Sequence, residues 1–193
     1  SRKDMLQRMN AKLSESIPLL REKFFVQLIR DSRTDRLSTE KRIDFLDLRL
    51  PYDAPYCALI VRIDNPRAIF DTMTEQNTQL ISFAIQNICQ EIVDARASGS
   101  VFEHQRGEYV LLVALPETEG EDVIFPLASE LMASLNDFLK RMAKEISLTI
   151  GIGAAVANLG KMADSYQMAA EAIERKLFLG KNQVITFDVM AAQ

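Results

Sequence analysis

Two acidic residues, Asp64 and Glu108, are the side chains of this sequence best suited to hold a metal ion. Carboxylate oxygens are preferred ligands of hard cations such as Mg²⁺, so the two would form one weak site if they met. A simpler arrangement is favoured, in which both are solvated or one of them forms a salt bridge with Arg62 or Arg106. We therefore expect no metal in this chain.

Positive charge suited to an anion is offered by Arg62, Arg67 and Arg106. Guanidinium groups bind carboxylate or phosphate through paired hydrogen bonds, so the ligand class would be an anionic metabolite or nucleotide. His104 is the only histidine, which excludes sites built from two histidines. We place His104 on the surface of a hairpin.

Two further motifs are weaker. Gly151-Ile152-Gly153 begins like a dinucleotide-binding loop, but Val156 stands where the third glycine would be, so we expect no cofactor. Cys57 and Cys89 lie in apolar runs without CxxC spacing, which is typical of buried reduced thiols.

Composition limits the class of protein. Of 193 residues, 48% are hydrophobic and 26% are charged, which is enough apolar material for a full core. The net charge of −4 argues against a nucleic-acid clamp. No apolar run is long enough to span a membrane and no signal peptide opens the chain, so we expect a cytoplasmic location. Because the sequence begins within a predicted helix and stops after a strand, we expect a piece of a longer protein.

The first thirty residues predict one long amphipathic helix over residues 2–30. Pro18 removes a backbone donor, so we expect a kink or a restart near it, with Ser16 as a cap. For the first half, a dimerising connector and a helix packed on its own domain are equally favoured; after Pro18 the second is preferred. Ser38 predicts a further cap, of a short helix ending near Leu48. The apolar stripe of the long helix comprises Leu6, Met9, Leu13, Ile17, Leu20, Phe24 and Leu28.

From Tyr56 the pattern alternates between strands and helices. Continuous or alternating apolar residues predict strands, and helical spacing predicts the segments between them. The last helix is expected to begin at Asp164 as its cap, to include Leu177, and to end at a left-handed Gly180 with Arg175, Lys176 and Lys181 nearby. The expected elements are strand 56–63, helix 75–96, a hairpin over 99–115 turning at Arg106-Gly107, helix 119–144, strand 148–152, helix 164–179 and strand 184–187.

The closing segment carries a family resemblance. Ala169-Ala170-Glu171-Ala172-Ile173, followed by Leu179-Gly180-Lys181-Asn182-Gln183-Val184, resembles the end of GGDEF (diguanylate cyclase-like) domains. With Phe187-Asp188 it is closer to the degenerate GGDEF-like middle domain of YesN-type response regulators, which lies between a receiver and an AraC-type helix-turn-helix. The resemblance covers about residues 56–187. It implies an α+β, ferredoxin-like nucleotide-cyclase sandwich of about five strands with an antiparallel-containing sheet, which the element order also favours.

The same resemblance implies that the cyclase motif is altered. Arg62-Ile63-Asp64 occupies the run in which active cyclases carry a metal-binding Asp, so Arg62 reverses the charge there. Gln105-Arg106-Gly107-Glu108-Tyr109 aligns with G-G-D-E-F and keeps only the last acidic residue and the aromatic. No R-x-x-D product-binding motif is found around Arg96. From these losses we expect no cyclase activity and no enzyme.

The resulting hypothesis divides the chain into an N-terminal helical connector, residues 1–50, and a degenerate GGDEF-like domain, residues 51–193. Its function would be non-catalytic signal coupling and dimerisation in a cytoplasmic, AraC-type two-component transcriptional regulator. The N-terminal helix would form the homodimer, the receiver and helix-turn-helix would lie elsewhere in the full-length protein, and DNA would be bound only by that protein, with no membrane. The alternative is a ligand-sensing domain that binds an anionic metabolite or nucleotide in the vestigial cyclase cleft.

Overall fold

The structure, a computed structural model, describes residues 1–31, 33–175 and 180–186. Three predicted elements have the bounds expected of them: β1 (Tyr56–Ile63), α4 (Glu75–Arg96) and β4 (Leu148–Ile152). The predictions made for Lys176, Leu177 and Phe187 lie outside the described residues. Among the described residues, no helix combines the length and apolar character needed to cross a membrane.

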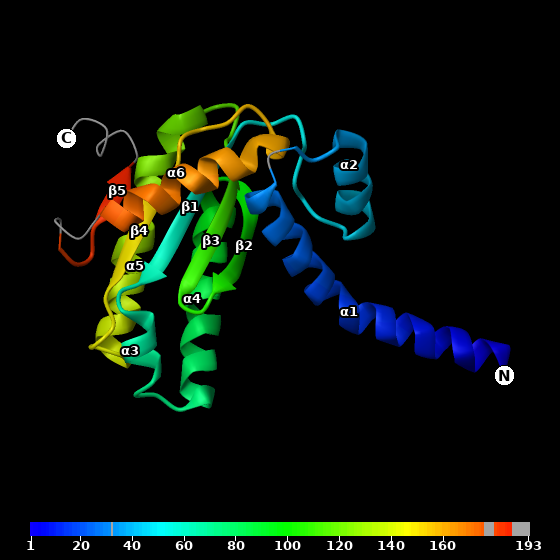
Figure 1. Ribbon diagram of the computed structural model, residues 1–193, viewed down its shortest axis with the longest axis horizontal. Helices are drawn as coiled ribbons and strands as arrows, with labels where there is room; N and C mark the ends of the chain where they lie inside the picture. The colour runs from blue at the N-terminus through cyan, green and yellow to red at the C-terminus, as the bar shows by residue number, and fades with distance from the viewer. Residues whose placement is uncertain (32, 176–179, 187–193) are drawn as a thin grey trace.

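A five-stranded sheet forms the centre of the domain (Figure 1). The predicted hairpin consists of β2 (Ser98–Gln105) and β3 (Glu108–Ala114), and the last strand is β5 (Val184–Thr186). The strand order is β2-β3-β1-β4-β5, with antiparallel neighbours except for the parallel pair β4 and β5. The five-stranded α+β fold predicted from the sequence is confirmed.

The central strand β1 is buried on both faces, as its continuous apolar sequence predicted. Its odd-numbered residues pack in a core with α4 and α5 (Ile124–Met142), and its even-numbered residues face the end of α1 and α6 (Met162–Glu174). Figure 1 shows α6 crossing one face of the sheet while α4 and α5 cover the other. The structure is therefore a three-layer sandwich.

The long helix α1 (Arg2–Arg30) is continuous and contains Pro18. The predicted restart with Ser16 as a cap is wrong, because the Ser16 hydroxyl donates to the Lys12 carbonyl, 2.9 Å away, within the helix. Figure 1 shows that α1 changes direction along its length, as expected of a helix with an internal proline.

The two ends of α1 have different surroundings. Residues 2–16, here called the distal arm, are all exposed, and Figure 1 shows this end extending away from the domain. Residues 20–30, here called the seated segment, pack against α6 and β2. The preference for packing after Pro18 is confirmed. The buried residues of the seated segment are Phe24, Phe25, Leu28 and Ile29.

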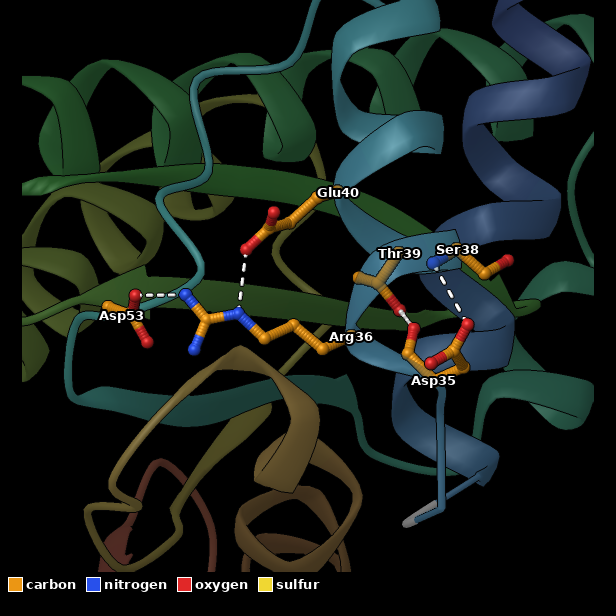
Figure 2. Close-up of polar contacts among 6 residues, drawn as sticks. All are labelled: Asp35, Arg36, Ser38, Thr39, Glu40 and Asp53. Atoms are coloured by element: carbon orange, nitrogen blue, oxygen red, sulfur yellow. Dashed lines mark hydrogen bonds and ion pairs between the residues drawn. The ribbon is translucent and has the colours of Figure 1, made fainter.

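Helix α2 (Arg36–Phe45) packs beside the seated segment and begins one turn before the predicted cap. Asp35, not Ser38, is its N-cap: the Asp35 carboxylate accepts from the Ser38 backbone N–H at 3.2 Å (Figure 2). Arg36 pairs with Glu40 at 2.8 Å and also with Asp53, which ties α2 to the segment before β1. Asp53, followed by Glu40, raises the pKa of the exposed Arg36 through hydrogen bonds to its guanidinium.

Several element boundaries differ from the sequence-based expectation. A short helix α3 (Pro66–Phe70) was not predicted, and α5 is preceded by the 3₁₀ turn η1 (Gly120–Val123). Another turn, η2 (Leu159–Lys161), leads directly into α6, so the helix begins at Met162 and Asp164 lies in its first turn. The predicted Asp164 cap is therefore wrong. Gly180 does adopt the left-handed conformation, with φ +88°.

The two glycines of Gly151-Ile152-Gly153 have a packing role. A Cβ atom on Gly151 would lie 2.6 Å from the Ala169 carbonyl oxygen, and one on Gly153 would lie 2.1 Å from that of Ser165. Both contacts are too short for any side chain. The glycines therefore allow α6 to lie close against β4.

Candidate functional site

An ion pair between Arg62 and Glu108 lies where β1 ends beside the start of β3. The two residues are direct partners across the strands, and Arg62 Nη2 donates to Glu108 Oε1 at 3.1 Å. The Glu108 side chain is only 3% exposed, whereas that of Arg62 is 30% exposed. Of the two arrangements that the sequence left open for Glu108, solvation or a salt bridge with an arginine, the structure has the salt bridge, with Arg62. A buried carboxylate requires such a partner, because an unpaired buried charge is strongly unfavourable.

Two more side chains complete a compact polar group around this carboxylate. The Tyr166 hydroxyl, from α6, donates to Glu108 Oε1 at 3.3 Å, and His104 Nδ1, from β2, lies 3.3 Å from Oε2. The same His104 nitrogen lies 3.2 Å from the Tyr166 oxygen. Burial, and then the nearby Glu108 carboxylate, raise the pKa of Tyr166. We call Arg62, His104, Glu108 and Tyr166 the Glu108 cluster.

The surface position predicted for His104 is wrong, because its side chain is only 9% exposed. Alternation along β2 places His104 on the same face as Phe102, beneath α1 and α6. Its ring stands edge-on to Phe102 and Tyr166, with centroids 6.4 and 5.8 Å away. Its second nitrogen, Nε2, is buried without a hydrogen-bond partner. His104 is therefore an interior polar residue.

Asp64 is held by different groups from those that hold Glu108. Its carboxylate accepts hydrogen bonds from Ser147 Oγ at 2.6 Å and Thr149 Oγ1 at 2.9 Å, beside and on β4. Within the described ranges, no three His, Cys, Asp or Glu side chains gather as a metal site would require. The resemblance to cyclases implies magnesium, which needs hard oxygen ligands. These residues do not fit that ion, because the Arg62 guanidinium occupies Glu108.

The turn of the hairpin carries the remaining positions of the altered motif. Gln105 and Arg106 are exposed, and Gly107 has φ +83°, which favours glycine. A Cβ atom on Gly107 would also lie 2.9 Å from Cβ of Pro66. Tyr109 is completely buried in the core beneath α4 and α5. The aromatic that aligns with the motif's last residue is thus a packing residue.

The three arginines proposed as an anion site lie in two places. Arg62 belongs to the Glu108 cluster on the α1 and α6 face. Arg106 lies 5.0 Å from the centre of the Phe70 ring, and Phe70 packs in the core on the opposite face. Arg67 is exposed on α3, the helix that also carries Phe70. A groove of about 420 Å³ adjoins Arg106, and it is also lined by Glu75, Thr78, Gln79, Ser82, Phe83, Gln86 and Glu103.

With this geometry established, comparison with known families identifies the class of protein. A family model described as the GGDEF-like domain matches residues 31–174, well over half of the sequence. The chain therefore belongs to the GGDEF-like domain family. A comparison with curated proteins finds no match.

Solved structures share this fold. The active GGEEF domain of a diguanylate cyclase from Vibrio cholerae has a TM-score of 0.57 and 17% identity, covering 83% of this chain and 94% of that one. The coiled coil and GGDEF domain of DgcB from Caulobacter crescentus, in complex with c-di-GMP, has a TM-score of 0.54 and 14% identity, covering 96% and 97%. Diguanylate cyclase SiaD with its activator SiaC, from Pseudomonas aeruginosa, has a TM-score of 0.53 and 14% identity, covering 96% and 74%.

These findings correct the expectation that the chain is not an enzyme. The family is related to diguanylate cyclases, and the fold is shared with an active cyclase domain over most of both chains. The exchanges at Arg62, Gln105 and Arg106 are therefore no ground for ruling out an enzyme. The cyclase reaction belongs among the activities to be measured.

Sequence reasoning missed one member of the cluster. Tyr166 was not among the predicted site residues, although its hydroxyl contacts Glu108 and His104. Its position depends on how α6 lies across the sheet, which no local pattern reports. The close approach of α6, signalled by Gly151 and Gly153, was the available clue.

Proposed function

We propose that this chain is a signal-coupling and dimerisation domain of a cytoplasmic two-component transcriptional regulator. Two copies pair through the distal arms of α1, and the pairing sets the arrangement of the GGDEF-like domains. The full-length protein carries a receiver upstream and an AraC-type helix-turn-helix downstream, and that protein alone contacts DNA. The net charge of −4 supports this division of labour, since a DNA-binding surface is basic. Signal coupling of this kind does not depend on catalysis by the domain and does not exclude it.

The observation that carries the proposal is the exposed apolar stripe of the distal arm. Met5, Leu6, Met9 and Leu13 are 62%, 54%, 59% and 44% exposed. They recur at helical spacing on an arm that projects from the domain (Figure 1). An apolar stripe on such a helix becomes buried when a second helix packs along it. The similar DgcB structure is described as a coiled coil with a GGDEF domain, which supports this reading of the arm.

Light scattering across a concentration series tests the pairing. The wild-type chain is expected to be dimeric, and the double variant Leu6→Glu/Leu13→Glu is expected to be monomeric because charge on the stripe opposes its burial. The matched control is Leu37→Glu/Leu80→Glu, which alters two leucines exposed to a similar degree on α2 and α4. A monomeric wild type, or an equal loss of mass in both variants, would contradict the proposal.

The groove beside Arg106 favours one second candidate, a sensor of an anionic metabolite or nucleotide. Arg106 is exposed there, and the polar residues Thr78, Ser82 and Gln86 line the same groove. Calorimetric titration with GTP and magnesium, with a parallel assay for cyclase product, tests both binding and turnover. Binding that is lost in Arg106→Ala but retained in Arg67→Ala would support this site. No heat with GTP or with a panel of sugar phosphates would eliminate it.

The sequence predicted that residues 1–50 form the connector, and we propose a shorter one. The seated segment of α1 and the Ile43 side chain of α2 belong to one buried group with Phe102 and Val110 of the sheet. The family match begins at residue 31. In the coupling function proposed here, only the distal arm therefore acts as a connector, and the rest of residues 1–50 moves with the sheet.

A further inference from the structure

A continuous series of side-chain contacts joins the seated segment of α1 to the Arg62–Glu108 pair. The Phe25 ring stacks on Phe102 of β2, with centroids 5.3 Å apart and planes inclined by 28°. Phe102 meets His104 edge-on, and His104 lies 3.3 Å from the Glu108 carboxylate. Glu108 in turn holds Arg62. The series runs from the helix that carries the distal arm to the end of β1.

The members of this series from Phe25 to Glu108 are buried or nearly so. Phe25 is 6% exposed and Phe102 is 2% exposed, while the His104 and Glu108 side chains are 9% and 3% exposed. Close-packed protein interiors transmit displacement, because a buried ring cannot move without its neighbours moving. Arg62, at 30% exposure, is the one member whose side chain reaches solvent. A displacement of Phe25 is therefore expected to end in a movement of the Arg62 side chain.

A charge interaction supports the same route. Arg30, the last residue of α1, lies close enough to Tyr166 for its charge to oppose the rise in the Tyr166 pKa. Tyr166 donates to Glu108 and also touches His104. The end of α1 thus acts on the Glu108 cluster by packing through Phe25 and by charge through Arg30.

We propose that the position of α1 on the sheet controls whether Glu108 holds Arg62. With α1 seated, the Phe25–Phe102 stack keeps His104 against Glu108, and Glu108 retains the Arg62 guanidinium. When pairing of the distal arms shifts the seated segment, His104 moves away from Glu108. The Glu108 carboxylate then loses a contact that fixes its orientation toward Arg62, and the Arg62 guanidinium turns to the surface. The proposal rests on the function proposed above and gives it a physical route from dimer to domain.

The sole histidine provides a direct readout, because its ring C–H signals in a ¹³C-labelled chain need no assignment between sites. Phe25→Leu is expected to shift the His104 signals, since it removes the ring that stacks on Phe102. The matched control is Phe24→Leu, a residue of equal size on the same helix. Its ring lies under the Arg42 guanidinium, 5.3 Å away, and is tilted against Phe25 at 6.2 Å between centroids, but it does not stack on Phe102. Glu108→Gln is the positive control, since it alters the partner of His104 directly.

The expected result is a His104 shift in Phe25→Leu approaching that in Glu108→Gln, with a much smaller one in Phe24→Leu. Equal shifts in the two phenylalanine variants, or none in Phe25→Leu, would overturn the proposed route. A second comparison uses the arm: His104 signals should differ between wild type and Leu6→Glu/Leu13→Glu, and Phe25→Leu should abolish that difference. Identical signals in a dimeric wild type and the monomeric variant would also overturn it.

The two proposals fail in different ways. If light scattering shows a monomeric wild type, the coupling function through dimerisation is wrong, while the comparison of Phe25→Leu with Phe24→Leu still decides whether α1 acts on Glu108. If the wild type is dimeric and its His104 signals are unchanged by both the Leu6→Glu/Leu13→Glu and the Phe25→Leu substitutions, dimerisation stands and the route is wrong.

Discussion

The two ends of α1 carry the same apolar stripe, but the stripe is buried in the seated segment and exposed in the distal arm. In the seated segment, Phe24 and Leu28 are 2% and 1% exposed, and they pack in one buried group with α2 and the sheet. In the distal arm, Leu6 and Leu13 are 54% and 44% exposed. The comparison shows that hydrophobic spacing identifies the face of a helix that will be buried and is silent about the partner that buries it.

The largest difference between the two ends is expected in stability. Leu28→Ala should lower the free energy of unfolding by about 2–5 kcal/mol, because it leaves a cavity in the buried group. Leu13→Ala should change that of the monomer by less than about 0.5 kcal/mol, since its side chain is largely exposed already. Chemical denaturation at a protein concentration below the dissociation constant of the proposed dimer measures both. Equal losses in the two leucine variants would show that the distal arm packs on its own domain.

Much of the fold follows from periodicity, because strands and helices buried on one or both faces impose it. The bounds of β1, α4 and β4 were predicted correctly, as was the turn at Arg106-Gly107. Helix starts were less accurate: α2 is capped by Asp35 and α6 begins at Met162 directly after a 3₁₀ turn. Ser38 and Asp164 resemble caps in sequence, but a residue of the right type one turn earlier, or a preceding turn, displaces them.

The candidate site was only partly accessible from the sequence. Charge alone suggested that Glu108 pairs with a nearby arginine, and the register of β1 with β3 provides that partner in Arg62. His104 was misplaced because a single polar residue in a hairpin carries no sign of what packs above it. Here Tyr166 of α6 packs on its ring and Phe25 of α1 packs on the neighbouring Phe102, and both helices come from distant parts of the chain.

The second-largest effect is expected from comparing a buried ion pair with an exposed one. Arg62→Leu should lower the free energy of unfolding by about 1–3 kcal/mol, because it leaves the buried Glu108 carboxylate without its charged partner. The matched control is Arg141→Leu, whose pair with Asp137 at 2.9 Å joins side chains that are 71% and 70% exposed. That variant should lose less than about 1 kcal/mol. Denaturation curves that rank them in the reverse order would refute the assigned role of Glu108.

A smaller effect is expected at the edge strand β2, which, unlike the distal arm, is covered by its own domain. The Gln90 side chain, from α4, donates to the Gly99 carbonyl at 3.0 Å and accepts from the Val101 N–H at 3.1 Å. It thus occupies backbone groups that another strand would otherwise pair with. Gln90→Ala should cost about 1 kcal/mol and promote association at high concentration. Gln76→Ala, an exposed glutamine on the same helix, should do neither in parallel denaturation and light-scattering measurements.

The last effect comes from ionisation of the buried thiols, which is negligible at neutral pH. At alkaline pH it should lower the stability of the core and leave the distal arm unaffected. Burial raises the pKa of both Cys57 and Cys89 from 9.0 to about 12. The folded state therefore keeps its protons where the unfolded state loses them. The resulting stability is complete below pH 9.0 and falls as the pH rises from there through about 12.

This pH dependence can be isolated by comparing wild type with Cys57→Ala/Cys89→Ala in denaturation at neutral pH and above pH 9.0. Burial raises the pKa of Tyr56 and Tyr109 in both proteins. The difference in stability between wild type and the double variant therefore reports on the thiols. The variant should be less stable at neutral pH because of lost packing, and this deficit should shrink as the pH rises. A deficit that stays constant with pH would mean that the thiols ionise alike in the folded and unfolded chains. The dimerisation proposed for the distal arm, which contains neither cysteine nor tyrosine, should be insensitive to these thiols throughout.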